Sequence, residues 1–184
     1  MFDRFLLDAT VYSDVIRRSP DTALAAWLDE RLERCHICAL TVMHMTTGIA
    51  SLRARGGPER LARAEWYWTR DRAFLDLFTG RFIPLTSGIF GRAGEILGQA
   101  RHRIGDIEES DCLLAAAAES RDLAVATRNA RHFAATGVRF FDTSTLSRNR
   151  VYGNDQKEPT ILKVILGGEL DKPHEDTLER TAFS

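Results

Sequence analysis

Apolar and polar positions follow two alternating periodicities along this chain. Short apolar runs typical of buried strands occur at Phe5–Thr10, Cys35–Leu40, Phe82–Leu85, Leu123–Thr127 and Val138–Phe141. The segments between them have apolar residues three and four positions apart, which is the spacing of a helix that buries one face. Strands that alternate with helices predict an α/β domain, with a three-layer α/β/α arrangement and a central parallel sheet of about five strands.

Capping and breaking residues set the expected helix ends. Ser19 is expected to cap a helix that has Pro20 at its first position. Gly56-Gly57 should end another helix, and Pro58 should begin a long one that ends before Gly80. We expect the apolar stripe of that long helix to lie in the core rather than to form a ligand cage; its members are Leu61, Ala64, Trp68, Leu75 and Phe78.

The character of the sequence changes near Leu146, where a polar, linker-like stretch begins. We therefore predict a domain over residues 1–146 and a C-terminal extension of unknown role over 147–184. Thr160–Leu166 is apolar and is predicted to add a strand. The polar residues 171–184 are expected to be disordered or to hold a short helix.

Composition bounds the class of protein. The chain has 184 residues, 44% of them hydrophobic and 28% charged, with a net charge of −1, which is typical of a globular domain that is not strongly basic. No apolar run approaches a bilayer span and the N-terminus does not resemble a signal peptide, so we expect a cytoplasmic protein without a membrane contact. Arginines are nevertheless concentrated locally, and they either cover solvated helix faces or bind nucleic acid; they are Arg53, Arg55, Arg60, Arg63, Arg70 and Arg72, with Arg101 and Arg103 further on.

Cysteine spacing offers a weak metal signal. Cys35-His36-Ile37-Cys38 resembles a zinc knuckle, but no second pair follows it. Residues three apart on a strand also point to opposite faces of the sheet. Buried thiols are the favoured interpretation.

Polar residues that follow predicted strands or open predicted helices suggest where the chemistry lies. Asp8 ends the first strand, and Asp111 lies in the first half of a predicted helix. Residues at the carboxyl ends of parallel strands gather at one edge of the sheet, which is where such folds bind ligands. Two carboxylates there suit Mg²⁺ or Mn²⁺, which can activate water against a phosphodiester. Alternatively, each Asp caps a helix or satisfies a loop.

The order of these segments is similar to that of PIN-domain proteins of the VapC/FitB toxin type, from about Phe5 to Thr143. The matching segments are Leu6-Leu7-Asp8-Ala9-Thr10-Val11-Tyr12-Ser13, Trp27-Leu28-Asp29, Leu40-Thr41-Val42 through Gly48-Ile49, Arg81-Phe82-Ile83-Pro84-Leu85, Ser110-Asp111 with Ala115-Ala116, and Ala126-Thr127-Arg128-Asn129 before Phe133. The resemblance implies a parallel sheet between helices and a Mg²⁺- or Mn²⁺-dependent ribonuclease that acts on RNA. It also implies a homodimer and a cognate antitoxin protein as partner.

The resemblance also implies a site with substituted acids. Asp8 and Asp111 match the first and third acids of the family, whereas His44 stands at the second and Asn129 or His132 at the fourth. The implied catalytic residues are therefore Asp8, Asp111, His44 and Asn129, with His132 as a further candidate metal ligand. Each negative charge removed at ~4 Å takes away up to about 4 kcal/mol of attraction for the cation at an effective dielectric of ~20. Histidine also shifts metal preference away from Mg²⁺.

Two hypotheses follow. The chain is a metal-dependent endoribonuclease, the toxin of a toxin–antitoxin pair, or it is a catalytically impaired PIN-fold module that binds an antitoxin-like partner or RNA. Glu108 and Glu109 lie close to Asp111 in sequence; they either replace a missing acid or are first-turn helix charges. A different α/β hydrolase is disfavoured because the chain has no Gly-x-Ser-x-Gly elbow and no phosphate loop.

Overall fold

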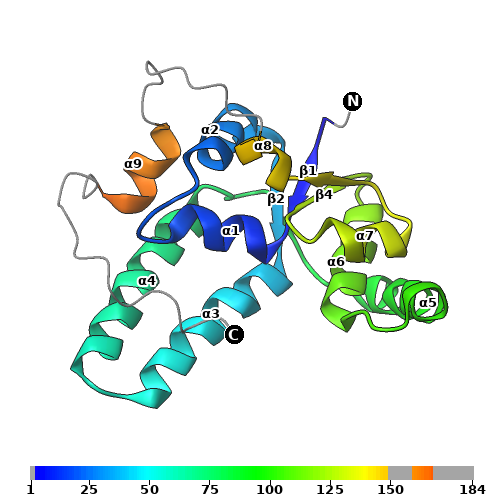
Figure 1. Cartoon of the computed structure of the whole chain (residues 1–184), viewed down its shortest axis with the longest axis horizontal. Coiled ribbons are helices and arrows are strands. Elements are labelled where there is room, and N and C mark those ends of the chain that lie inside the picture. Colours follow the sequence, from blue (N-terminus) through cyan, green and yellow to red (C-terminus); the bar gives the residue numbers. More distant parts are fainter. Residues whose placement is uncertain (1–2, 149–158, 168–184) are drawn as a thin grey trace.

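The computed structural model describes residues 3–148 and 159–167 and contains a parallel sheet of five strands (Figure 1). The strands lie in the order β3-β2-β1-β4-β5, so β1 is central. Their bounds are β1 Phe5–Leu7, β2 Cys35–Cys38, β3 Phe82–Ile83, β4 Ala124–Thr127 and β5 Phe140–Asp142. Each predicted strand up to Phe141 is present, and the predicted α/β/α architecture is confirmed.

Helices connect the strands and cover both faces of the sheet, as Figure 1 shows. Their bounds are α1 Ala9–Ile16, α2 Thr22–Arg31, the 3₁₀ turn η1 Leu32–Arg34, α3 Ala39–Arg55, α4 Pro58–Asp76, α5 Ser87–Ile104, α6 Glu109–Glu119, α7 Ala130–Thr136, α8 Ser144–Arg148 and α9 Thr160–Leu166. The predicted break at Gly56-Gly57 is confirmed. Gly56 after α3 and Gly105 after α5 both have positive φ, which favours glycine at a helix end. Among the described residues, no helix is both long enough and apolar enough to cross a membrane.

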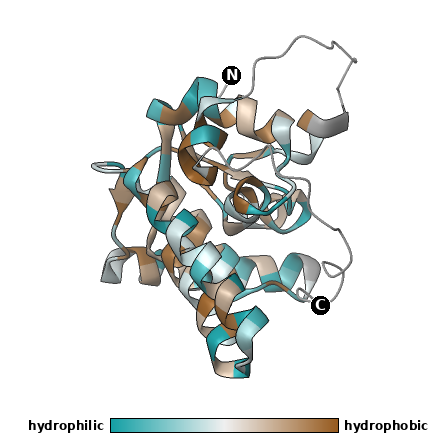
Figure 2. Ribbon diagram, turned by 90° about the vertical axis from the view of Figure 1, so that its left-hand side faces the viewer, coloured by the Kyte–Doolittle hydropathy of each residue, from teal (hydrophilic) through white to brown (hydrophobic). Residues whose placement is uncertain are grey.

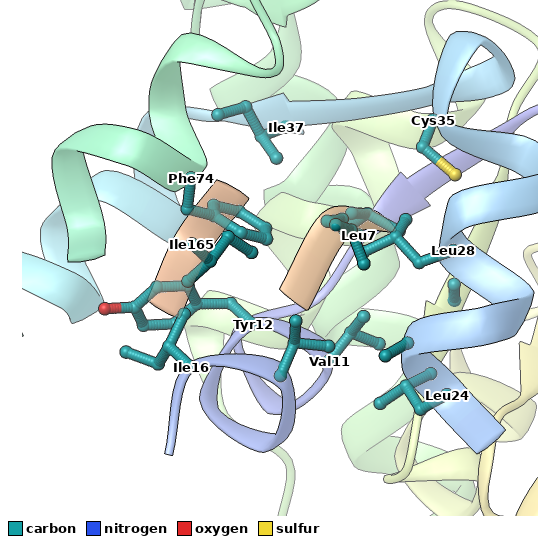
Figure 3. Packing of buried hydrophobic residues seen from close by; sticks show 14 of the residues in the cluster. Leu7, Val11, Tyr12, Ile16, Leu24, Leu28, Cys35, Ile37, Phe74 and Ile165 are labelled. Carbon is teal, nitrogen blue, oxygen red and sulfur yellow. The ribbon is translucent and has the colours of Figure 1, made fainter. Parts of the chain in front are cut away.

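The sheet separates two hydrophobic clusters. One is rich in aromatic side chains and joins the sheet to α1, α2, α4 and α9, with Tyr12, Phe74 and Ile165 close together in Figure 3. The other is rich in alanine and joins the sheet to α5, α6 and α7. Cys35 belongs to the first cluster and Cys38 to the second, so the two thiols point to opposite faces. All three cysteines are buried and free, which contradicts a zinc knuckle in this part of the chain.

Three boundaries differ from the sequence-based prediction because local hydrogen bonds decide them. β1 ends at Leu7 rather than Thr10, since α1 begins immediately after Asp8. Asp21, not Ser19, caps α2, because its carboxylate accepts hydrogen bonds from the backbone N–H groups of residues 23 and 24, both at 3.1 Å. α6 begins at Glu109, so Asp111 lies in its first turn, whereas the sequence placed Asp111 only within the first half of a helix.

The predicted strand at Thr160–Leu166 is wrong, since this segment is helix α9. Its side chains Ile161, Leu162, Ile165 and Leu166 are buried in the aromatic-rich cluster. The Asp29 carboxylate accepts hydrogen bonds from the first two backbone N–H groups of α9, at 3.0 and 3.1 Å. Tertiary packing and this cap therefore override the strand propensity of the β-branched residues. The predictions for 171–184 lie outside the described residues, and the division at residue 146 stays a prediction.

The predicted core stripe of α4 is correct only in part. Ala64 and Phe78 are buried, but Leu61 is 50% exposed and Trp68 is 38% exposed. Figure 1 shows the reason: the first half of α4 lies beside the second half of α3 in a hairpin that extends from the body of the molecule. These apolar side chains have no sheet to pack against.

Candidate active site

Asp8 lies where β1 ends and α1 begins, at the carboxyl edge of the central strand. Its backbone N–H donates to the carbonyl of Ala126 at 3.0 Å, so β4 lies directly alongside. β2 is the other neighbour of β1, and the strand order therefore reverses between β1 and β4. Ligands of open parallel sheets bind outside such a reversal, at the carboxyl ends of the strands.

Two hydroxyl groups fix the Asp8 carboxylate. Thr10 Oγ1 donates to Asp8 Oδ2 at 2.7 Å, and Thr127 Oγ1 donates to the same oxygen at 2.6 Å. Thr127 is fully buried, and its hydroxyl also accepts the backbone N–H of Asn129 at 2.8 Å. Asp8 is 7% exposed and sits at the N-terminus of α1, where the helix dipole favours a negative charge.

Asp8, His44 and Asp111 line one pocket at this edge, as the sequence predicted for the two acids and for His44. α3 contributes His44 from its first half, and α6 contributes Asp111 from its first turn. Segments more than sixty residues apart in sequence therefore meet at the pocket. The complete lining is Asp8, Ala9, Leu40, Thr41, His44, Ser110, Asp111 and Leu114.

His132 on α7 contacts Asp111, and Asn129, at the N-cap position of α7, contacts His132; neither residue lines the pocket. His132 Nδ1 lies 2.7 Å from Asp111 Oδ2 and also 2.7 Å from Asn129 Nδ2. A ring nitrogen either donates or accepts, so Nδ1 donates to Asp111 when it carries a proton and accepts from Asn129 when it does not. The sequence did not predict this coupling between Asp111 and His132.

The electrostatics of Asp111 follow from these neighbours. Burial raises the pKa of Asp111 above its ordinary value, the hydrogen bond from His132 lowers it, and the negative charge of Asp8 raises it again. Asp8 acts on Asp111 in this way because both carboxylates line the same pocket. Asp111 is therefore easier to protonate than a carboxylate on the surface.

Sequence reasoning missed two supports of this edge. Thr41 is buried and donates its hydroxyl to the carbonyl of Leu7 at 3.2 Å, which ties α3 to the end of β1. Arg128 bridges Asp14 at 2.7 Å and Asp21 at 2.8 Å, which ties the loop after β4 to α1 and α2. Arg128 could be noticed in the sequence as part of the Thr-Arg pair before Asn129. Only the fold shows which carboxylates it contacts.

The two glutamates near Asp111 do not line the pocket. Glu109 forms an ion pair with Arg101 at 3.7 Å, and Glu108 accepts a hydrogen bond from Ser110 Oγ at 3.1 Å. Both glutamates lie at the start of α6, where acidic side chains are favoured. They are therefore first-turn helix charges rather than replacements for a missing acid.

The donor set of the pocket suits a divalent cation in part. Among residues 3–148 and 159–167, no three His, Cys, Asp or Glu side chains gather closely enough to hold a metal ion. Mg²⁺, however, is held in many proteins by one or two carboxylates, with water and substrate phosphates as its other ligands. Asp8 and Asp111 meet this smaller requirement.

Comparison with known proteins agrees with the fold and the order of these residues. The sequence profile of the PIN domain matches residues 5–138. The chain belongs to the PIN-domain family. It is 31% identical to the toxin FitB of Neisseria gonorrhoeae over 138 residues, which cover 74% of this chain and 96% of FitB. It is 27% identical over 134 residues to VapC ribonuclease Y4jK of Sinorhizobium fredii, covering 72% and 92% of the two chains.

Solved structures of PIN proteins have the same fold. A chain of FitAB bound to an IR36 DNA fragment matches with a TM-score of 0.63 and 31% identity, over 74% of this chain and 93% of that one. A chain of the DNA-bound VapBC complex from Salmonella typhimurium matches with a TM-score of 0.61 and 20% identity, over 77% and 98%. The predicted resemblance to VapC/FitB proteins is confirmed.

Proposed function

We propose that this PIN-domain chain is the toxin of a toxin–antitoxin pair and acts as a metal-dependent endoribonuclease. The observation that carries the proposal is the meeting of Asp8 and Asp111 in one pocket at the carboxyl edge of the sheet. Membership of the PIN family supports it, and so do the names of the relatives, which include a toxin and a ribonuclease.

Asp8 and Asp111 are the residues that would hold Mg²⁺ or Mn²⁺, with His44 facing the same space. A bound divalent cation would polarise a phosphodiester and lower the pKa of a water molecule. Thr10 and Thr127 keep the Asp8 carboxylate in one orientation, so it needs no rearrangement to act. His132 Nδ1 lies within hydrogen-bond distance of both Asp111 and Asn129, so it positions the Asp111 carboxylate.

The second candidate function is a PIN-fold module that binds an antitoxin-like partner or RNA without cleaving it. The observation in its favour is the small number of acidic ligands: His44 stands in the pocket, and Asp111 is engaged by His132. Under either function, the antitoxin as partner and the homodimer remain proposals. They are supported by relatives solved as toxin–antitoxin complexes.

The test is RNA cleavage by the full chain with Mg²⁺, with Mn²⁺ and with EDTA. Asp8→Asn and Asp111→Asn should each reduce cleavage at least about a hundredfold, because each removes a hard anionic ligand without changing shape. Asp76→Asn, which changes an exposed carboxylate on α4, is the matched control and should cleave like the wild type. Cleavage that persists in both pocket variants, or in EDTA, would reject the proposed enzyme. A wild type that binds RNA without cutting it would favour the binding module.

A further inference from the structure

The hairpin made by the second half of α3 and the first half of α4, residues 51–72, extends from the body and is called the arm (Figure 1). In Figure 2 it forms the lower end of the molecule, where hydrophilic residues alternate with hydrophobic ones. The proposed active site uses only the beginning of α3, through Thr41 and His44. The arm is therefore a surface without a role so far.

Positive charge is concentrated on the arm, although the whole chain has a net charge of −1. Glu59 and Glu65 are its exposed acids, whereas Asp71 is buried and accepts a hydrogen bond from the Tyr12 hydroxyl. Five arginines lie wholly or partly at the surface of the arm: Arg53, Arg55, Arg60, Arg63 and Arg72. The arm is therefore a surface to which an anionic polymer would be attracted.

Aromatic rings hold several of these guanidinium groups. Arg53 and Arg72 lie over the ring of Trp68, with guanidinium-to-centroid distances of 5.4 and 5.8 Å, and Arg63 lies 5.7 Å from the ring centroid of Tyr67. A ring orients a guanidinium without neutralising its charge, in contrast to a carboxylate. Glu65 neutralises Arg53 in part, at 3.5 Å. Ordered, charged guanidinium planes beside aromatic rings are suited to single-stranded nucleic acid, which offers phosphates to pair with and bases to stack on.

α3 connects the arm to the pocket. Arg55 lies eleven residues after His44, about three turns and ~16 Å along the same helix face. The exposed residues between them on that face are Gly48 and Ser51, which have small side chains. A stacked strand with ~3.4 Å per nucleotide would need about five nucleotides to cover this length. Arg55 makes no ion pair with any described residue, so its charge is available to a phosphate.

We propose that the arm binds single-stranded RNA that extends from the pocket, so that it positions the substrate of the proposed ribonuclease. This inference rests on the proposed function, since it assigns the same RNA to a second contact surface. The two surfaces have separate roles: the arginines of the arm provide affinity for RNA, and the carboxylates of the pocket provide cleavage. Short RNA that ends at the pocket gains nothing from the arm.

The test measures binding of a fluorescent RNA of about 12 nucleotides to the full chain in EDTA, by anisotropy, from about 50 to 200 mM salt. Arg55→Glu and Arg60→Glu should each weaken binding about tenfold at the lower salt concentration. The slope of log K against log salt should become shallower by about 0.7 for each phosphate that is no longer neutralised. Arg121→Glu is the matched control, since Arg121 is exposed in the turn between α6 and β4, and it should bind like the wild type. A trinucleotide should bind all four proteins equally.

Each outcome decides the proposal. If both arm variants bind the longer RNA as the wild type does, the arm is not an RNA surface, whatever the pocket does. If they keep RNA affinity but change the sedimentation coefficient of the protein, the arm is a protein–protein contact and the proposal is wrong. If the wild type neither binds nor cleaves RNA, the proposed function is wrong, and so is the role of the arm that rests on it. If both arm variants bind the longer RNA more weakly, while Asp8→Asn binds it like the wild type and no longer cleaves it, both proposals stand.

Discussion

The two sides of the pocket hold their carboxylates in different ways. On the β1–β4 side, Asp8 is held by two hydroxyls that stay neutral and remain donors across the physiological pH range. On the α6–α7 side, Asp111 is held by one ring nitrogen of His132, and burial raises the pKa of Asp111 itself. The first side is thus a fixed part of the site, and the second is a part whose protonation can vary. The following changes test this difference.

On the Asp8 side, the change with the largest expected effect is Thr127→Val, which removes the buried hydroxyl. Asp8 Oδ2 and the backbone N–H of Asn129 would both be left without this partner, because one hydroxyl serves both. Leaving buried polar groups unpaired costs about 1–3 kcal/mol. Urea denaturation should show a loss of this size, whereas Thr46→Val, on the exposed surface of α3, should stay within about 0.5 kcal/mol of the wild type. Equal stability of the two variants would contradict the fixed role of Thr127.

Another buried carboxylate, Asp71 on α4, shows what happens without several donors. Burial raises the pKa of Asp71 to about 7, and Tyr12 donates one hydrogen bond to it. In the unfolded chain the group ionises near 4. Between about pH 4 and pH 7 the folded protein therefore keeps a proton on Asp71 that the unfolded chain has lost. The contribution of Asp71 to stability is complete below about pH 4 and is lost as pH rises towards 7.

Asp71→Asn should remove this pH dependence, since an amide keeps an acceptor but does not ionise. The wild type should lose up to about 1.4 kcal/mol of unfolding free energy per pH unit relative to the variant between pH 4 and 7. Urea titrations at several pH values measure this difference, with Asp76→Asn on the same helix as the exposed control. Parallel pH profiles for all three proteins would show that Asp71 is ionised in the fold.

His44→Glu is expected to raise cleavage in Mg²⁺ about tenfold. The neutral imidazole of His44 faces the pocket beside two carboxylates, and a third carboxylate would add a hard oxygen ligand and a negative charge. The gain should be smaller in Mn²⁺, which accepts nitrogen ligands more readily. His44→Glu combined with Asp8→Asn should not cut, which excludes a contaminating nuclease. A variant no better than the wild type in either metal would show that His44 does not occupy a ligand position.

The smallest effect is expected from His132→Ala. Because the hydrogen bond from His132 lowers the pKa of Asp111, its loss should raise that pKa further. Carbon-13 NMR of the aspartate carboxyl groups measures the shift, with the Asp111 signal assigned by its absence in Asp111→Asn. His102→Ala on α5 is the control and should leave the signal unchanged. A pKa of Asp111 that falls, or does not move, would contradict the proposed coupling.

The fold could be predicted from the sequence wherever periodicity and strand length agreed. The five short apolar runs are all strands, and Thr86 caps α5 as its sequence indicates. Thr160–Leu166 was mispredicted because a seven-residue apolar run fits either a strand or a helix. The deciding contacts are the cap from Asp29 and the core behind it, and Asp29 lies more than 130 residues away in sequence.

The candidate site was predictable in its position but not in its internal contacts. Asp8, His44 and Asp111 were expected at one edge because their segments follow strands or open helices, and they line one pocket. The contact between His132 and Asp111 depends on how α7 lies against α6, which no spacing in the sequence specifies. The catalytic and metal-binding roles of Asp8, Asp111, His44, Asn129 and His132 stay predictions.

The most direct test is whether Asp8 and Asp111 together hold one cation. Mn²⁺ binding to the full chain can be followed by electron paramagnetic resonance, with wild type, Asp8→Asn, Asp111→Asn and the control Asp76→Asn. We predict one site in the wild type and in the control, and its loss in both pocket variants, because neither carboxylate suffices alone. Binding that is the same in all four proteins, or absent from the wild type, would contradict a shared cation site.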